Sequence, residues 1–352
     1  MFLIYIKLSS KNKMAMRTQL KKISKIILVF LLFLFIFSCS SKTKRPDVSN
    51  ISVDIKIHRF DLDLFRLKQN PDLGAFKEKY SDFLSLYSNK VIGLGNTNSS
   101  DYMDYLNKFL YDSIMTAVSE QVAKSFPNLD GVQNELDESF KLLKYYFPKK
   151  SIPQIYTQIS GFNQSIVVAP NLIGISLDKY LGAECEFYKY LRTPMYARKN
   201  MIPKRIGQDI ILAYALTEFP FQPTKDDLIS NMIYQGKVRF FVQHLMPDKS
   251  EANVMKYSDE DLAWCKENES LMWGYIIEQK HLFSTDYRTI IKYINDGPFT
   301  PGMPQESPSR TGIWIGWQIV KKFMNKHPEY TLRDLMAEND YEKILRESSF
   351  QP

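Results

Sequence analysis

Apolar residues recur with a helical period over most of the chain. Between residues 99 and 125 they return every three or four positions on one face, which predicts a helix that Phe126-Pro127 ends. A second helix is predicted from about residue 129 to 147, and Pro148 ends it. Its apolar face consists of Val132, Leu136, Phe140, Leu143 and Phe147.

Two other segments alternate apolar and polar residues with a period of two. Residues 51–60 (ISVDIKIHRF) predict a half-buried strand, with His58 on its polar face as a surface imidazole. Residues 153–177 alternate in the same way and then continue as short apolar runs around the Pro170-Asn171 turn. This second segment predicts two or three antiparallel strands in the middle of the chain.

Pairs of a hydroxyl residue and an aspartate three positions later mark helix starts in the second half. Thr224/Asp227 opens a predicted helix to about Leu245, and Ser258/Asp261 opens one to about His281. Thr331/Asp334 opens a short C-terminal helix.

A long irregular loop is predicted at residues 297–312, which hold four prolines and three glycines. The helix after it carries Ile313, Trp317, Val320 and Met324 on one face. We therefore expect a mostly α-helical α+β fold with a small, mostly antiparallel mid-chain sheet. Residues 51–352 are expected to form a single domain, because no repeat or linker interrupts them.

The N-terminal segment has the pattern of an export signal. Residues 26–37 are twelve unbroken apolar residues, preceded by a basic stretch and followed by Ser38-Cys39-Ser40. Twelve helical residues rise about 18 Å, too short for a hydrocarbon core of about 30 Å. We expect a lipoprotein signal peptide over 1–38, lipidation of Cys39 and a flexible tether over 39–50. The alternative is an uncleaved signal anchor.

The charge distribution argues against a nucleic-acid partner. The formal net charge is +7, but seven basic residues precede residue 26 and no acidic residue precedes Asp47. From Cys39 onward, 39 basic residues balance 39 acidic ones. The body therefore has no excess of basic charge to bind a phosphate backbone.

Local motifs of catalysis and metal binding are missing from the sequence. None of the four histidines lies three or four residues from another, and there is no Gly-x-Ser-x-Gly elbow and no phosphate-binding loop. We expect no metal and no cofactor. Cys185 and Cys265 have 79 residues between them, and whether they pair stays open.

Four sequence features together resemble one protein family. They are the lipoprotein Cys39, the FDLDLF motif at Phe60–Phe65, NDGPFT at Asn295–Thr300 and SPSRTGIWIGWQIVKKF at Ser307–Phe323. They resemble the gliding motility-associated lipoprotein GldB family of the Bacteroidetes, from about residue 50 to 350. The resemblance implies a role in surface gliding and in type nine secretion, with other proteins of that machinery as partners.

The second half also resembles zinc-peptidase-like proteins in decayed form, which implies a degenerate zincin-like architecture. An edge strand at Ile173–Leu177 would precede helices at Pro203–Phe219 and Asp226–Leu245. The first helix contains no histidine, and Gln235-Gly236 stands where a ligating glutamate would be expected. The resemblance therefore implies a pseudo-peptidase without catalysis.

A groove for a protein segment would lie beside that edge strand, which can add an extended peptide as a further strand. Asp209, Gln235 and Arg310 are its candidate residues. The alternative is structural: Asp209 and Arg310 are helix-end charges, and Gln235 is a satisfied buried amide. Trp314 and Trp317 are expected in the core, because they recur at helical spacing.

We expect a lipid-anchored protein that faces the periplasm and acts through protein contacts without catalysis. The basic segment SSKTKRPDVS after Cys39 favours the periplasmic side, since surface-exported lipoproteins of the Bacteroidetes tend to carry acidic residues there. The alternatives are a divergent periplasmic hydrolase and a lipoprotein that binds a peptide or glycan.

Overall fold

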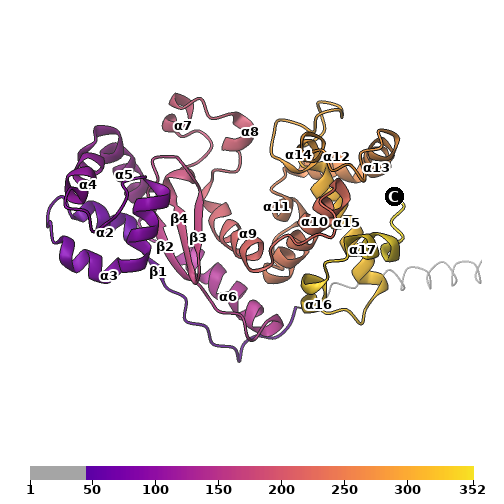
Figure 1. The fold of residues 1–352 in the computed structure, drawn as a ribbon, viewed down its shortest axis with the longest axis horizontal. Coiled ribbons are helices and arrows are strands. Elements are labelled where there is room, and N and C mark those ends of the chain that lie inside the picture. The colour runs from indigo at the N-terminus through magenta and orange to yellow at the C-terminus, as the bar shows by residue number, and fades with distance from the viewer. Residues whose placement is uncertain (1–44) are drawn as a thin grey trace, which may run out of the picture. The chain divides into compact units, whose positions relative to one another are not determined.

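The computed structural model describes residues 45–352, so the predicted signal peptide and Cys39 lie outside the described residues. Asp47–Pro352 forms one compact unit. Helices dominate it and a small four-stranded sheet is present, which confirms the predicted mostly helical α+β class (Figure 1).

The elements follow the chain in three groups. The first is β1 (Ile57–His58), α2 (Phe60–Arg66), α3 (Leu73–Leu86), a π-helical turn (Tyr87–Val91), α4 (Tyr102–Tyr111), α5 (Ser113–Ser125) and α6 (Asp130–Tyr146). The second is β2 (Gln154–Gln158), β3 (Ile166–Ala169), β4 (Leu172–Ser176), a 3₁₀ turn (Leu177–Lys179), α7 (Glu186–Tyr190) and α8 (Met195–Arg198). The third begins with a 3₁₀ turn (Pro203–Arg205) and continues through α9 (Ile206–Glu218), α10 (Leu228–Leu245), α11 (Glu251–Met255), α12 (Asp259–Glu267), α13 (Glu269–Glu278), α14 (Tyr287–Ile294), α15 (Thr311–Lys326), α16 (Leu332–Ala337) and α17 (Tyr341–Ser348).

The sheet has the strand order β1-β2-β4-β3 and is mixed, so the expected mostly antiparallel sheet is wrong. β3 and β4 form an antiparallel hairpin, but β2 pairs in parallel with both β1 and β4. The physical reason is the connection: Asn171 turns the chain with a φ of 58°, and β4 then returns between β3 and β2. β3 runs opposite to β2 and β4 runs opposite to β3, so β4 is parallel to β2 beside it.

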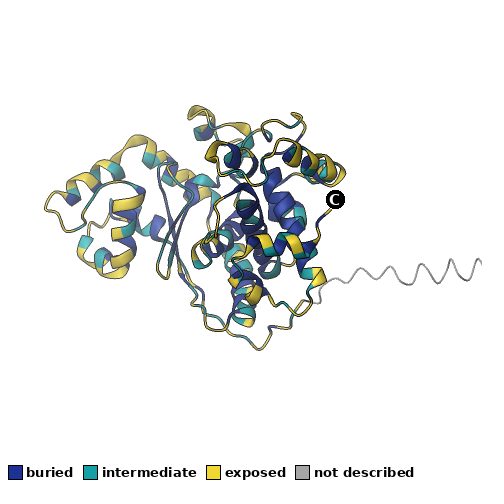
Figure 2. Ribbon diagram, turned by 45° about the vertical axis from the view of Figure 1, so that its right-hand side comes forward, coloured by how far each residue is buried: buried dark blue, intermediate teal, exposed yellow. Residues whose placement is uncertain are grey.

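The two faces of the sheet belong to two cores. Ile155, Ile173 and Ile175 pack into the larger core, which the later helices complete. Tyr156 and Val167 point to the other face and pack into a smaller core with α2, α3 and α4. Figure 2 shows buried residues on the strands and on the helix faces around them. The period of two in the sequence therefore reflects burial on both faces rather than one solvated face.

The FDLDLF motif lies where the first predicted strand gives way to a helix. Only Ile57 and His58 pair in the sheet, and Phe60 already begins α2, so the expected strand over 51–60 is mostly wrong. The Phe60 ring is fully buried among four aromatic rings at centroid distances of 4.9–5.3 Å, those of Phe76, Tyr80, Phe83 and Tyr87. The motif is therefore a packing element of the smaller core.

Two further helix boundaries differ from the predictions. The helix expected over 99–125 is two helices, since Asp112 has a ψ of 133° and its carboxylate caps α5. The helix expected from Ser258 to about His281 is also divided, at Asn268, although the predicted capping box at Ser258 is confirmed. At α10 the cap is Asp227, which accepts from the Ser230 amide, and the helix begins at Leu228. Asp112 supplies its own cap whereas Asn268 makes no side-chain cap bond, and hydrophobic periodicity detects neither break.

Helices α10 and α15 are in backbone contact at two glycines. A Cβ atom on Gly316 would collide with the main-chain carbonyl of Met232, and one on Gly236 would collide with the backbone at Gly316. Only glycine allows this approach. Trp314 and Trp317 of α15 are buried, as expected of core residues.

Cys185 and Cys265 are both free in the structure, and Cys265 is buried. Within residues 45–352, no helix is both long and apolar enough to cross a bilayer.

Candidate functional site

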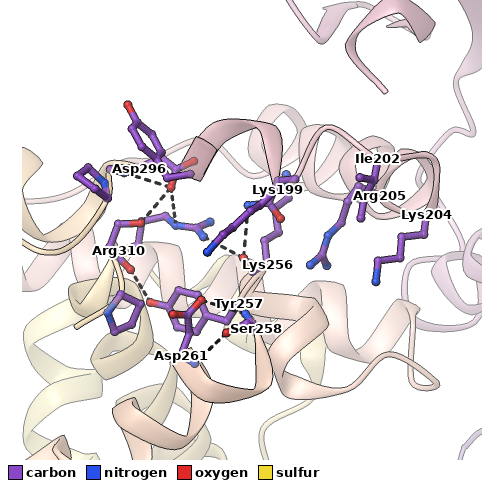
Figure 3. Close-up of a pocket in the computed structure, with 16 residues that line it drawn as sticks. Lys199, Ile202, Lys204, Arg205, Lys256, Tyr257, Ser258, Asp261, Asp296 and Arg310 are labelled. Carbon is purple, nitrogen blue, oxygen red and sulfur yellow. Dashed lines mark hydrogen bonds and ion pairs between the residues drawn. The ribbon is translucent and has the colours of Figure 1, made fainter. Parts of the chain in front are cut away.

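Three helices of the second half begin around one cavity of about 270 Å³. The N-cap residues of α9, α12 and α15 all line it, and they are Arg205, Ser258 and Arg310. In the view of Figure 3, Arg205 and Lys204 lie on one side of the cavity and Arg310 on the other, with Lys199 and Lys256 between them. We call this site the cation-rich cavity.

Two of its cations stand in left-handed backbone conformations. Lys256 ends α11 with a φ of 57°, and Arg310 precedes α15 with a φ of 62°. For a residue other than glycine, this conformation costs about 1–2 kcal/mol. At Lys256 this is the conformation that commonly ends a helix, whereas Arg310 adopts it at a helix start.

Asp209 lies in the first turn of α9 and is the buried acid of the site. Lys256 Nζ lies 2.5 Å from Asp209 Oδ1, and the Tyr180 hydroxyl donates to Oδ2 over 3.0 Å. Burial lowers the pKa of Lys256, whereas the charge of Asp209 raises it. Both carboxylate oxygens of Asp209 are therefore engaged by groups of the chain itself.

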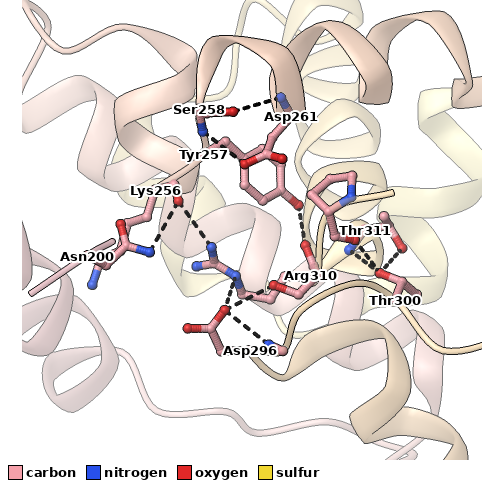
Figure 4. Close-up of polar contacts among 12 residues, drawn as sticks. Asn200, Lys256, Tyr257, Ser258, Asp261, Asp296, Thr300, Arg310 and Thr311 are labelled. Atoms are coloured by element: carbon pink, nitrogen blue, oxygen red, sulfur yellow. Dashed lines mark hydrogen bonds and ion pairs between the residues drawn. The ribbon is translucent and has the colours of Figure 1, made fainter. Parts of the chain in front are cut away.

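Arg310 ties the loop before α15 to the turn after α11 (Figure 4). Its Nη2 donates to the Lys256 carbonyl over 3.3 Å, and its Nε lies 3.5 Å from Asp296 Oδ1. The guanidinium carbon stands 5.4 Å from the centroid of the Tyr257 ring, and the Tyr257 hydroxyl donates to the Ser309 carbonyl over 2.7 Å. The loop therefore holds Arg310 against the cavity wall.

Two more arginines are buried at the site. Arg205 Nη1 donates to the Asn253 carbonyl over 2.9 Å, and burial lowers the pKa of Arg205. Arg239, on α10, is 5% exposed, and burial together with the charge of Arg310 lowers its pKa to about 10. The charge of Asp209 opposes this shift, so the pKa of Arg239 depends on the charges around the cavity.

Positive charge exceeds negative charge at this site. Among the described residues, six cations lie at or directly behind the cavity: Lys199, Lys204, Arg205, Arg239, Lys256 and Arg310. The three carboxylates are those of Asp209, Asp261 and Asp296, and Asp261 is engaged in the capping box of α12. The chemistry that this arrangement supports is charge recognition, because cations dominate its lining.

The sequence comparison identifies the family. Residues 41–352 match the family described as gliding motility protein GldB. The chain belongs to the GldB family. As a family member it is a gliding motility-associated lipoprotein, and the resemblance noted for its motifs is confirmed. No curated protein and no solved structure matches the chain.

Two of the three predicted groove residues of this GldB family member come together in the structure. Asp209 and Arg310 both contact Lys256, one through its ammonium group and the other through its carbonyl. Gln235 is half-buried on α10, one turn before Arg239, and does not line the cavity. Cys39, the predicted lipidation site, lies outside the described residues.

The position expected for a peptide-binding edge is wrong. Ile173–Leu177 was expected as an edge strand, but β4 lies between β2 and β3 and pairs with both. Its main-chain groups are therefore used within the sheet, and it cannot add another strand. The wider likeness to zinc-peptidase-like proteins stays a prediction.

Sequence reasoning missed Arg205, Arg239 and Lys256. The signal available was modest: Pro203-Lys204-Arg205 places cations at a helix start, where acids are normally preferred. Arg239 in an otherwise apolar stretch of α10 was a second signal, because an arginine among buried residues needs a partner. Lys256 gives no sequence signal, since its role follows from the turn between α11 and α12.

Proposed function

We propose that this GldB family protein is a membrane-anchored lipoprotein required for gliding motility and the associated type nine protein secretion. It acts through contacts with other proteins of that machinery and without catalysis. The observation that carries the proposal is the family match, which spans residues 41–352.

The anchor in this proposal is the lipidated Cys39, and the body from Asp47 onward faces the periplasm. The apolar segment at 26–37 followed by Cys39 supports a lipoprotein signal. Several acyl chains on one residue hold a protein stably at a membrane, whereas one chain alone is marginal. The body then remains close to the envelope proteins that it contacts.

The geometry around Asp209 supports the absence of catalysis. In the zincin likeness, α9 would carry two histidines and a general base, but its sequence IGQDIILAYALTE holds none of the histidines. Its buried carboxylate, Asp209, is bound by Lys256 and Tyr180. A carboxylate fixed by a cation and a hydroxyl donor is poorly placed to take a proton from water.

The experiment is deletion of the gene in the host, complemented with the wild type and with Cys39→Ala. Colony spreading and secreted adhesin are measured together. We expect the deletion to stop both and Cys39→Ala to restore neither at normal protein level. Normal spreading and secretion in the deletion strain would refute the proposal.

A second measurement tests the absence of catalysis. The purified full chain is assayed for bound zinc and for cleavage of unfolded casein. Stoichiometric zinc together with proteolysis would overturn the non-catalytic role and favour the divergent hydrolase.

A further inference from the structure

Three arginines at the cation-rich cavity are more than nine-tenths buried. Arg205, Arg239 and Arg310 have exposed fractions of 6%, 5% and 8%. Within the described residues, no hydrogen-bond partner is present for Nε of Arg205 or for Nε and Nη1 of Arg239. Arg205 keeps the bond from Nη1 to the Asn253 carbonyl, but each unpartnered buried nitrogen carries a desolvation cost that only an opposite charge or a further acceptor offsets.

The carboxylates of the chain supply only part of that opposite charge. Asp209 is engaged by Lys256 and Tyr180, and Asp261 accepts from the Ser258 amide at the start of α12. Asp296 has a 45% exposed side chain and lies 3.5 Å from Arg310 Nε, a distance that gives a weak ion pair in water. The cavity therefore retains an excess of buried positive charge.

The helix starts add to this excess. Neither α9 nor α15 has a side-chain hydrogen bond at its N-cap, and in both the N-cap residue is an arginine. The N-terminus of a helix carries partial positive charge, so a cation there is unfavourable and an anion is favourable. Both helices thus direct positive potential at the same cavity.

We propose that the cation-rich cavity binds the phosphate group of a small phosphorylated molecule. Arg205 and Arg310 face the phosphate, Arg239 adds charge from α10, and Lys199 and Lys204 stand exposed at the rim. This inference goes beyond the proposed role in gliding and does not depend on it.

The charge and the size of the cavity favour phosphate over carboxylate. A phosphate monoester carries about two negative charges near neutral pH, against one for a carboxylate, and so matches the surplus of buried cations better. Guanidinium groups also pair with phosphate oxygens in a fork. A cavity of about 270 Å³ lies just below the ~300–1,000 Å³ typical of small-molecule sites, so the ligand is small.

The test is titration calorimetry of the purified full chain in nonionic detergent, with pyrophosphate as the probe and with ionic strength held constant. We expect one pyrophosphate per chain and no response to acetate at the same concentration. The absence of pyrophosphate binding up to about 10 mM, a limit of roughly −3 kcal/mol, would overturn the proposal. Equal binding of acetate would overturn it as well.

Variants then locate the binding. Arg310→Gln and Arg205→Gln should weaken pyrophosphate at least about tenfold, since each removes a charged donor. Lys204→Gln changes an exposed rim residue, so it folds safely and should weaken binding by a smaller factor. Matched controls are Lys237→Met, a buried cation elsewhere on α10, and Lys90→Gln, an exposed lysine in the first half. Binding that is unchanged in the site variants would place the ligand elsewhere.

A second arm separates two sources of the phosphate group. Mixed micelles with phosphatidic acid or with phosphatidylcholine are compared with soluble pyrophosphate. Competition between phosphatidic acid and pyrophosphate identifies a lipid headgroup, and binding of pyrophosphate alone identifies a soluble phosphate. Both results support the phosphate site, whereas binding of a peptide carboxylate without any phosphate response would refute it.

Discussion

Replacing Arg239 by methionine should stabilise the protein in the absence of phosphate. Arg239 is 5% exposed, and burial lowers its pKa from 12.5 to about 10. Each pKa unit corresponds to 1.36 kcal/mol, so keeping this guanidinium charged in the fold costs about 3 kcal/mol. Methionine has a similar stem, and Nε and Nη1 lack hydrogen-bond partners that the exchange would leave unsatisfied. We expect the free energy of unfolding to rise by about 2 kcal/mol.

The pH range of this gain follows from the sign of the shift. The folded-state pKa of Arg239 is depressed, so the cost is fully present below pH 10 and declines only as the pH rises from about 10 towards 12.5. The gain of Arg239→Met should therefore be constant between about pH 6 and 9. The assay is urea unfolding of the full chain, followed by tryptophan fluorescence in buffer free of phosphate and sulfate.

The same variant connects stability to the proposed ligand. Added pyrophosphate should stabilise the wild type through preferential binding to the folded state and should stabilise Arg239→Met less. A loss of more than about 1 kcal/mol in Arg239→Met without phosphate would refute the reasoning, because it would mean that the guanidinium is satisfied within the fold.

The remaining predictions concern packing, a buried lysine and a helix cap. Gly316→Ala should cost about 3 kcal/mol by thermal or urea unfolding, because its Cβ meets a carbonyl of α10, whereas the matched control Gly274→Ala has open space and should be neutral or slightly stabilising. Burial lowers the pKa of Lys237 to about 8, so the folded wild type loses this proton at a lower pH than the unfolded chain does. The free energy of unfolding of the wild type, relative to that of Lys237→Met, should therefore rise by about 2 kcal/mol between pH 7.5 and 9.5. The same difference between the two proteins at both pH values would contradict this. Asp227→Ala should cost about 1 kcal/mol of unfolding free energy and Thr224→Ala close to nothing, because Asp227 is the cap of α10.

The helices of the body were largely predictable from periodicity, and the sheet was not. The predicted helix over 129–147 matches α6 (Asp130–Tyr146), because a continuous apolar face and a closing proline fix both its type and its end. The strands around residues 153–177 were found, but their pairing was not, since alternation gives no information about direction. The break at Asp112 was missed because the apolar face continues on both sides of it.

Only two residues of the candidate site were predicted, because the contacts that join them do not follow from a periodic sequence pattern. Asp209 and Arg310 were chosen through their positions in a likeness to peptidases, and the structure joins them through Lys256. That link depends on a left-handed turn between two short helices, which no periodic pattern encodes. The burial of Arg239 depends on how α10 packs against α15, and the sequence pattern does not predict this packing.

The family motifs gain separate physical meanings from the structure. In SPSRTGIWIGWQIVKKF, Gly316 lets α15 touch α10 backbone to backbone, while Arg310 lies at the cation-rich cavity. In NDGPFT, Thr300 accepts from the Thr311 amide over 3.4 Å and donates to the Pro308 carbonyl over 2.7 Å, so it fixes the loop that presents Arg310. Packing alone accounts for the glycine and for the buried threonine. It does not account for an arginine in a strained conformation at a helix start, where both the backbone and the helix dipole oppose it. Arg310 is therefore the residue of these motifs that packing explains least, and its variant is a direct test of the proposed phosphate site.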